Sequence, residues 1–265
     1  MLKKYKQIYK RDSKYRYKMK FVTWNIGGGY IFSEDPTKFD TEDINYFIEE
    51  LRHLKPDVIC LQEAHTSNLQ NQPQFIANAL GLQYVQSNVV DHSHIKEGEK
   101  LTISILSKFP LIKQRYVQVT NPNLESEYKG KICKSHNKGF LETFADYKNN
   151  SIRIITGHMN PFHIFNRDFM EDEFKIIRDE IKDMIYINQE TPMIFGGDIN
   201  HKNMIQLVPK LETTHQVILN DLPTIPKGSA LDKIIASKEW SFSNLQITKG
   251  KADHYMCSVE LELKN

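Results

Sequence analysis

Polar residues that could do chemistry stand at the ends of several apolar runs in this sequence. Such runs predict buried strands, and strand ends share one rim of a sheet sandwich, from which rigid elements can aim side chains into a common cleft. Carboxylate, amide and imidazole groups gathered at one rim suit the hydrolysis of a phosphate ester by water at a divalent cation. The residues concerned are Asn25, Glu63, His158, Asp198, Asn200, Asp232, Asp253 and His254.

A hard cation such as Mg²⁺ is the metal that these residue types favour. Mg²⁺ typically takes one or two carboxylates, keeps several waters and binds substrate phosphate. Asp198 could then activate or orient the attacking water, while the imidazoles of His158 and His254 could stabilise charge on the phosphoryl oxygens or shuttle protons. The oxygen ligands expected for Mg²⁺, or for Mn²⁺ as a substitute, are Asn25, Glu63 and Asp253.

Other reaction classes lack their usual motifs in this sequence. There is no Gly-x-Ser-x-Gly elbow, no cysteine in a nucleophile context and no Gly-x-Gly-x-x-Gly loop. Zinc is disfavoured because there is no clustered His and Cys spacing such as HExxH. The segment 91–94 offers His92 and His94, but without a helix or a third ligand it is a weak metal signal. Phosphoester hydrolysis is therefore the favoured chemistry.

Strand and helix signals alternate after residue 20, and these elements must position the polar set. Apolar residues at helical spacing predict a helix over 44–54 capped by Asp40 or Thr41, and a long helix over 167–187 with Met170 on its buried face. Strands are predicted over 21–26, 57–62, 84–90, 101–106, 111–119, 140–147, 152–157, 193–197, 230–236 and 258–263. This pattern predicts an α/β (α+β) fold, a single-domain four-layer sandwich of two mixed β-sheets flanked by helices.

Charge is divided unevenly along the 265 residues, although the net charge is only +2. Residues 1–20 carry nine Lys or Arg and one Asp, while the remaining 245 carry 26 basic and 32 acidic side chains. We expect 1–20 to form a flexible, basic, Tyr-rich extension and 21–265 to form the catalytic domain. A solvated tail is the favoured interpretation; an arm for nucleic-acid phosphates or anionic membranes and a true start at Met19 are the alternatives.

Cysteine usage and hydropathy indicate the compartment. Three cysteines without CxxC spacing favour a reducing, intracellular and cytoplasmic location, with Cys60 and Cys257 buried in the core. No apolar run approaches the ~20 residues of a membrane span. We therefore expect a monomer without a transmembrane segment.

In this order and at these strand ends, the motifs resemble the endonuclease/exonuclease/phosphatase superfamily of Mg²⁺-dependent phosphoesterases, which share a deoxyribonuclease-like fold. The resemblance runs from about Phe21 to Glu262, and the strand and turn over 103–110 also look like the family's ILSRFP segment. Each short motif is weak alone, but the ordered set is specific. The motifs are Trp24-Asn25, Gln62-Glu63, Gly157-His158, Gly197-Asp198-Ile199-Asn200, Leu231-Asp232 and Asp253-His254.

The resemblance implies a metal side of the site. Glu63 would be the main Mg²⁺ ligand, assisted by Asn25 and Asp253. Ala252 stands where the family usually has Ser before Asp-His, which removes a hydroxyl but neither a ligand nor a base.

The resemblance also implies a water and phosphate side. Asp198 would hold or deprotonate the attacking water, and Asn200 would hydrogen-bond the phosphate. His254 would contact the phosphoryl oxygens, positioned by a hydrogen bond to Asp232. His158 would be a second imidazole at the phosphate, so an active enzyme is expected.

The identity of the phosphoester stays open. Nucleic acid is the leading partner, which implies a nuclease or a DNA-end or repair phosphodiesterase. A phospholipid or inositol phosphate is the alternative, with a sphingomyelinase-like or 5-phosphatase-like enzyme using the same site. A non-catalytic phosphate-binding protein is disfavoured because the metal and water-activating residues are all present.

A few further residues could shape substrate binding. Phe162 and Phe165 could stack on a base or touch lipid, or else lie in the core, and His163 and His201 could line the cleft. The body's negative charge leaves only local basic patches for phosphate contacts. The clearest patch comprises Lys129, Lys131, Lys134 and Lys138.

Overall fold

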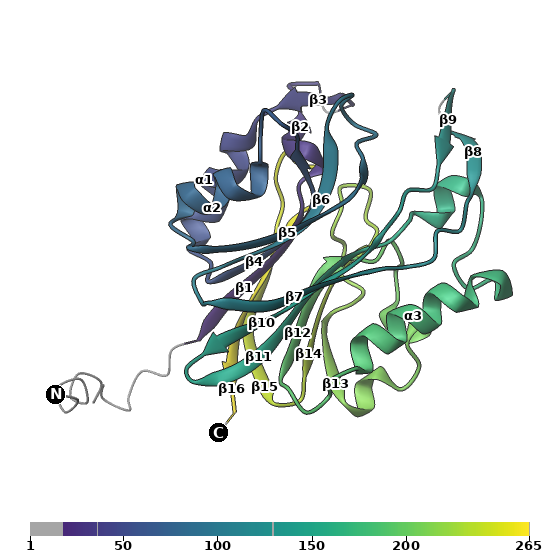
Figure 1. Cartoon of the computed structure of the whole chain (residues 1–265). Helices are drawn as coiled ribbons and strands as arrows, with labels where there is room; N and C mark the ends of the chain where they lie inside the picture. Colours follow the sequence, from purple (N-terminus) through teal and green to yellow (C-terminus); the bar gives the residue numbers. More distant parts are fainter. Residues whose placement is uncertain (1–17, 36, 129, 265) are drawn as a thin grey trace, which may run out of the picture.

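Two six-stranded sheets form the body of the protein in the computed structural model, which describes residues 18–35, 37–128 and 130–264 (Figure 1). Most of the expected basic extension, and Lys129, therefore lie outside the described residues. In spatial order, the first sheet contains β15 (Trp240–Thr248), β16 (Met256–Leu263), β1 (Met19–Asn25), β4 (Val58–Thr66), β6 (Lys100–Ser107) and β5 (Tyr84–His92). The second contains β13 (His215–Leu219), β14 (Asp232–Ser237), β12 (Met193–Asp198), β11 (Asn150–His158), β10 (Gly139–Tyr147) and β7 (Leu111–Gln118).

Both sheets are mixed. Each contains one parallel pair, β1 with β4 and β11 with β12, and is otherwise antiparallel. Helices α1 (Ile44–Leu54) and α2 (Gln72–Leu80) flank the first sheet, and α3 (Lys175–Tyr186) flanks the second (Figure 1). The predicted four-layer α/β sandwich is thus confirmed.

Alternation along the strands divides the core between the layers. Phe21 of β1 packs in the layer between the two sheets, whereas its neighbour Val22 packs with Phe47 of α1. Both faces of the central strands are covered, which explains their nearly continuous apolar sequences. Cys60 and Cys257 are fully buried between the sheets, as predicted.

Helix α1 begins later than its predicted cap. Asp43 is the N-cap, and its side chain accepts a hydrogen bond from the backbone N–H of Tyr46. The prediction of Asp40 or Thr41 was wrong because these residues belong to β3 (Phe39–Glu42), which pairs with β2 (Tyr30–Phe32). The helix ends at Lys55, whose left-handed backbone precedes Pro56.

The predicted helix over 167–187 is shorter in the structure. A 3-10 turn over Asp172–Phe174 precedes α3, and Met170 is 38% exposed, so its predicted place on a buried helix face was wrong. The Phe162 ring stacks on Phe169 with centroids 4.2 Å apart and also contacts Phe174. This aromatic packing holds the segment before α3 in an irregular path and accounts for the late helix start.

Several strands escaped prediction because they are short or because a register shift interrupts their alternation. They include the edge strands β13 and β15, the pair β2 and β3, and the hairpin of β8 (Glu125–Tyr128) and β9 (Lys131–Lys134). Strand β1 begins at the fully buried Met19, two residues before the predicted start. Within the described parts of the chain, no helix combines the length and the apolar character that crossing a membrane requires.

Candidate active site

The parallel strand pair of each sheet delivers two polar residues to one rim. Asn25 is the last residue of β1, and Glu63 lies in β4 just beyond the Gln62 that pairs with it. His158 and Asp198 end β11 and β12 and lie opposite each other in register. Adjacent parallel strands end at the same edge, and a hydrogen bond of 3.1 Å from Asn25 Nδ2 to Asp198 Oδ2 joins the two edges.

Asp198 is the centre of this group and is almost fully buried. Its Oδ2 accepts from the side chains of Asn25 and Asn200, and its Oδ1 accepts from the Asn200 backbone N–H at 2.9 Å. The same Oδ2 lies 3.6 Å from Nε2 of His158 and 3.7 Å from Nε2 of His254. A water molecule bonded to this carboxylate would therefore stand between two imidazoles.

Asn200 has a left-handed backbone and holds Asp198 in place. Its Nδ2 donates to the Met159 carbonyl at 2.9 Å and to Asp198 Oδ2 at 3.3 Å. Both amide hydrogens therefore have protein acceptors here, and the phosphate contact expected for Asn200 stays a prediction.

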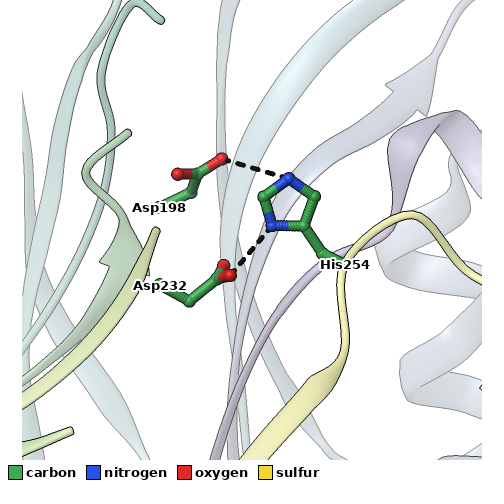
Figure 2. A group of neighbouring side chains, drawn as sticks. All are labelled: Asp198, Asp232 and His254. Carbon is green, nitrogen blue, oxygen red and sulfur yellow. Dashed lines mark hydrogen bonds and ion pairs between the residues drawn. The ribbon is translucent and has the colours of Figure 1, made fainter. Parts of the chain in front are cut away.

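His254 lies between two carboxylates. Figure 2 shows its ring with Asp198 on one side and Asp232 on the other. Nδ1 is 2.9 Å from Asp232 Oδ2, and the backbone carbonyl of His254 accepts a 2.9 Å hydrogen bond from the Trp24 indole. The structure thus brings Asp232 and His254 into the contact that the sequence predicts.

Burial and charge set the protonation states around Asp198. Burial is the main reason that the pKa of Asp198 is raised to about 6; Asp232 adds to the rise and His254 opposes it. Burial alone would lower the pKa of His254, but Asp232 and Asp198 outweigh it and hold that pKa well above its ordinary value. At neutral pH the site therefore combines an ionised Asp198 with a protonated His254.

Glu63 occupies a bulge in β4. The pairing of β4 with β6 shifts register between Leu61 and Ala64, and Glu63 has a φ of 55°, a left-handed conformation that turns its side chain out of the strand's alternation. Burial acts to raise the pKa of Glu63, but nearby cations and imidazoles lower it far below its ordinary value. These groups are His94, His158, Lys138 and His254.

Asp253 completes the expected metal side. Its Oδ1 is buried without a hydrogen-bond partner among the described residues. Burial raises the pKa of Asp253 to about 6; His254 opposes the rise and Glu63 adds to it. A side chain at Gly27 would place a Cβ 3.2 Å from that oxygen, so glycine keeps the approach open. An uncompensated, buried carboxylate oxygen beside Glu63 and Asn25 fits a hard divalent cation.

A second group of possible ligands lies across the site. Atoms of Asp198, Asp232 and His254 fall within 4.8 Å of one another, the one such three-residue group in the described chain. Because Asp232 Oδ1 also has no hydrogen-bond partner there, this group has a free carboxylate oxygen for a cation or a water.

Lys138 is a site residue that sequence reasoning missed. It immediately precedes β10 and is 2% exposed, with Nζ 3.0 and 3.2 Å from the two ring nitrogens of His158 and 3.7 Å from Glu63 Oε1. Lys138 was predicted to belong to a local basic patch with the lysines that lie close to it along the chain. The signal was the predicted hairpin: its antiparallel register sets Gly139 opposite His158 and so brings Lys138 to the site.

Other predicted candidates lie elsewhere. Phe162 and Phe165 are buried in the core, so the idea that they stack on a base or touch lipid was wrong. His201 packs edge-on against Phe169 and His163 is exposed; in the described chain neither hydrogen-bonds to a site residue. The segment 91–94 forms no three-ligand group among the described residues.

Histidines of the rim lie next to Glu63 instead. The His94 ring lies 5.1 Å from that of His136, whose Nδ1 is 3.5 Å from Asp91 Oδ2. His94 is exposed and lies close enough to Glu63 to help lower the pKa of that carboxyl. His94 and His136 therefore belong to this edge of the site.

Residues 22–249 match the model of the Endonuclease/Exonuclease/phosphatase family. The chain belongs to this family. Family members are hydrolytic phosphoesterases that typically use a divalent metal, so this protein is a phosphoesterase of the endonuclease/exonuclease/phosphatase type. The search of curated proteins gave no significant match.

Solved structures share the fold of this endonuclease/exonuclease/phosphatase protein at low identity. The family member from Beutenbergia cavernae DSM 12333 has a TM-score of 0.71 and 15% identity, with 94% of this chain and 72% of that chain covered. The human Nocturnin catalytic domain with bound sulfate has a TM-score of 0.68 and 14% identity, with 93% of this chain and 94% of that chain covered. The mannosyl-6-phosphatase Bt3783 from Bacteroides thetaiotaomicron VPI-5482 has a TM-score of 0.57 and 14% identity, with 92% of this chain and 99% of that chain covered.

Proposed function

We propose that this protein is a Mg²⁺-dependent phosphodiester hydrolase that acts on nucleic acid, as a nuclease or a DNA-end or repair phosphodiesterase. The observation that carries the proposal is the position of Asp198. Its carboxylate is held by Asn25 and Asn200 and lies within 3.7 Å of ring nitrogens of both His158 and His254. Such a carboxylate can orient a water for attack on a phosphorus atom that the imidazoles hold in place.

The residues divide the work by protonation state. Ionised Asp198 accepts a hydrogen bond or a proton from the attacking water. Protonated His254, kept charged by Asp232, donates to a phosphoryl oxygen where negative charge develops. Burial and Lys138 hold the pKa of His158 well below its ordinary value, so His158 acts as a neutral imidazole at the phosphate.

The metal belongs on the Glu63 side of the site. Glu63, Asn25 and Asp253 would hold Mg²⁺, or Mn²⁺ in its place, and the bound ion would polarise the phosphoryl oxygen and neutralise its charge. The free Oδ1 of Asp253 and the ionised state of Glu63 support this assignment. The group Asp198, Asp232 and His254 would then orient the attacking water and bind the phosphate.

The β8–β9 hairpin next to the rim is a candidate contact surface for a nucleic-acid substrate. Ser126 Oγ of β8 donates to the Ile164 carbonyl at 2.9 Å, which ties the β8–β9 hairpin to the segment that follows His158. Lys134 of this hairpin is well exposed and forms an ion pair with Glu125. An exposed lysine such as Lys134 beside a phosphodiesterase site can contact a phosphate that flanks the scissile one.

A substrate panel tests the proposal. Plasmid DNA, abasic duplex, 5′-tyrosyl oligonucleotide, poly(A), sphingomyelin, inositol phosphates and a hexose 6-phosphate are incubated with and without Mg²⁺. We expect Mg²⁺-dependent cleavage of one or more nucleic acids. Hydrolysis confined to the lipid, inositol or sugar phosphates would overturn the proposed substrate while leaving the phosphoester chemistry intact.

A further inference from the structure

Two lysines are fully buried near the site, and their hydrogen bonds differ sharply. Lys233 Nζ donates to three backbone carbonyls, those of Lys202, Asn220 and Ala230, at 2.5 to 3.3 Å. An ammonium has three N–H donors, so this lysine has an acceptor for each one. Lys233 is therefore accounted for as part of the fold.

Lys138 lacks such partners. Its Nζ is within hydrogen-bond distance only of the His158 ring among the described residues, and a neutral imidazole has one acceptor nitrogen. The nearest carboxylate oxygen, Glu63 Oε1, is 3.7 Å away, beyond a direct hydrogen bond. At least two N–H donors of a buried ammonium thus face the site without an acceptor, an arrangement that costs free energy unless a ligand completes it.

We propose that Lys138 is a substrate-binding residue whose ammonium donates to a non-bridging oxygen of the substrate phosphate, beside the metal position at Glu63. The proposal rests on the proposed function, because it assumes that the phosphoryl group enters between His158 and Glu63. Phosphate oxygens are strong acceptors for a lysine ammonium and would supply the two missing hydrogen bonds.

This role has a consequence for metal binding. The ammonium and a cation at Glu63 repel each other until an anion lies between them. Removing Lys138 should therefore leave the metal affinity of the free protein unchanged or tighter, while the affinity of the metal-loaded protein for phosphate falls. A lysine that serves only the fold would leave phosphate affinity unchanged.

The test compares Lys138→Met and Lys138→Arg with Lys182→Met, which removes an exposed lysine from α3, away from the site. Isothermal titration calorimetry measures Mn²⁺ binding to the metal-free protein, then inorganic phosphate binding to the Mn²⁺-loaded protein. We expect Lys138→Met to weaken phosphate binding by about 10- to 100-fold, the size of a charge-assisted hydrogen bond, without weakening Mn²⁺ binding. Lys138→Arg should retain part of the phosphate affinity, and Lys182→Met should match the wild type.

Phosphate affinity of Lys138→Met within twofold of the wild type would overturn the proposal. If Lys138→Met does not fold by circular dichroism, Lys138→Gln, which can still bond to His158, carries the same expectation. Failure of that variant to fold would also overturn it, because the lysine would then serve the structure. Binding is measured without turnover, so the result is independent of whether any phosphodiester is hydrolysed.

Discussion

Asp232 influences two ionisable neighbours at once. It raises the pKa of Asp198, adding to the effect of burial, and it raises the pKa of His254 against the effect of burial. One carboxylate thereby favours the protonated form of His254 and raises the pH at which Asp198 becomes ionised and can act as a base. Its role can be read from the pH dependence of turnover.

We predict a bell-shaped pH profile that Asp232→Asn moves to lower pH on both sides. The base Asp198 must be ionised, so activity falls as the pH drops through about 6. His254 must be protonated, so activity falls again as the pH rises through its elevated pKa. Without Asp232 both pKa values decrease. The control Asp146→Asn, at an exposed position near the end of β10, should leave the profile in place.

Asp253 is expected to lower the stability of the metal-free protein at neutral pH and to contribute to metal binding. Its pKa is raised in the folded protein to about 6, so the folded state binds the proton more tightly than the unfolded chain does. The stability that follows is present at low pH and is lost as the pH rises through about 6. At pH 7.5 the ionised, uncompensated carboxylate therefore destabilises the metal-free protein.

Replacing Asp253 by Asn should accordingly raise the free energy of unfolding of the metal-free protein at pH 7.5 by about 1–3 kcal/mol. The melting temperature should rise with it. The same variant should lose most of the additional stabilisation that Mn²⁺ gives the wild type. Differential scanning calorimetry with and without Mn²⁺ measures both effects, with Asp183→Asn on the exposed face of α3 as the control. A lower melting temperature for metal-free Asp253→Asn would contradict this account of the carboxylate.

At the scale of elements, the turn Gly27–Gly29 connects the metal side to the first sheet. Asn25 Oδ1 accepts from the Gly27 N–H, and the Gly28 carbonyl accepts from Gln72 Nε2 at 2.7 Å. Gln72 also accepts from the backbone N–H of His65, two residues beyond Glu63. The turn therefore couples the positions of Asn25 and Glu63.

Gly28→Ala tests this coupling. Gly28 has a φ of 68°, and an added Cβ would lie 2.3 Å from the His65 ring. Gly98 also has a positive φ, of 81°, but nothing lies within 4 Å of its Cβ position, so Gly98→Ala should cost only the roughly 1–2 kcal/mol of the left-handed backbone. Gly28→Ala should cost clearly more in urea unfolding and weaken Mn²⁺ binding; equal costs for the two variants would refute the packing argument.

Elements whose apolar pattern is continuous could be predicted from the sequence, and so could the residues at their ends. Asn25 and Asp198 were found because they end buried central strands. Lys138 was missed because its place depends on the register of a hairpin partner, and the late start of α3 depends on Phe162, which packs against it from outside the helix. In the edge strand β15, a bulge between Ser243 and Gln246 interrupts the alternation of apolar residues, so the local pattern does not show one continuous strand.

At the scale of the whole molecule, the apolar core that holds the fold together is separate from the metal side. Three apolar clusters hold the sheets and helices together, and all three cysteines are free. The metal side instead gathers carboxylates that repel each other. The apolar body thus holds the carboxylates of Glu63 and Asp253 close together, where a bound cation would offset their repulsion.

Chelation should therefore abolish turnover without unfolding the protein. We expect EDTA to remove activity while the far-ultraviolet circular dichroism spectrum is preserved, and added Mg²⁺ or Mn²⁺ to restore activity and raise the melting temperature by mass action. Loss of the folded spectrum on chelation would contradict this separation.

The most direct test of the central claim, that Asp198 activates or orients the attacking water, is the single-turnover rate of Mg²⁺-dependent hydrolysis of bis(p-nitrophenyl) phosphate by Asp198→Asn. We predict a loss of about a thousandfold relative to the wild type, within the range that a positioned base contributes, with an unchanged circular dichroism spectrum and with Asp183→Asn fully active. A rate for folded Asp198→Asn within tenfold of the wild type would contradict the claim.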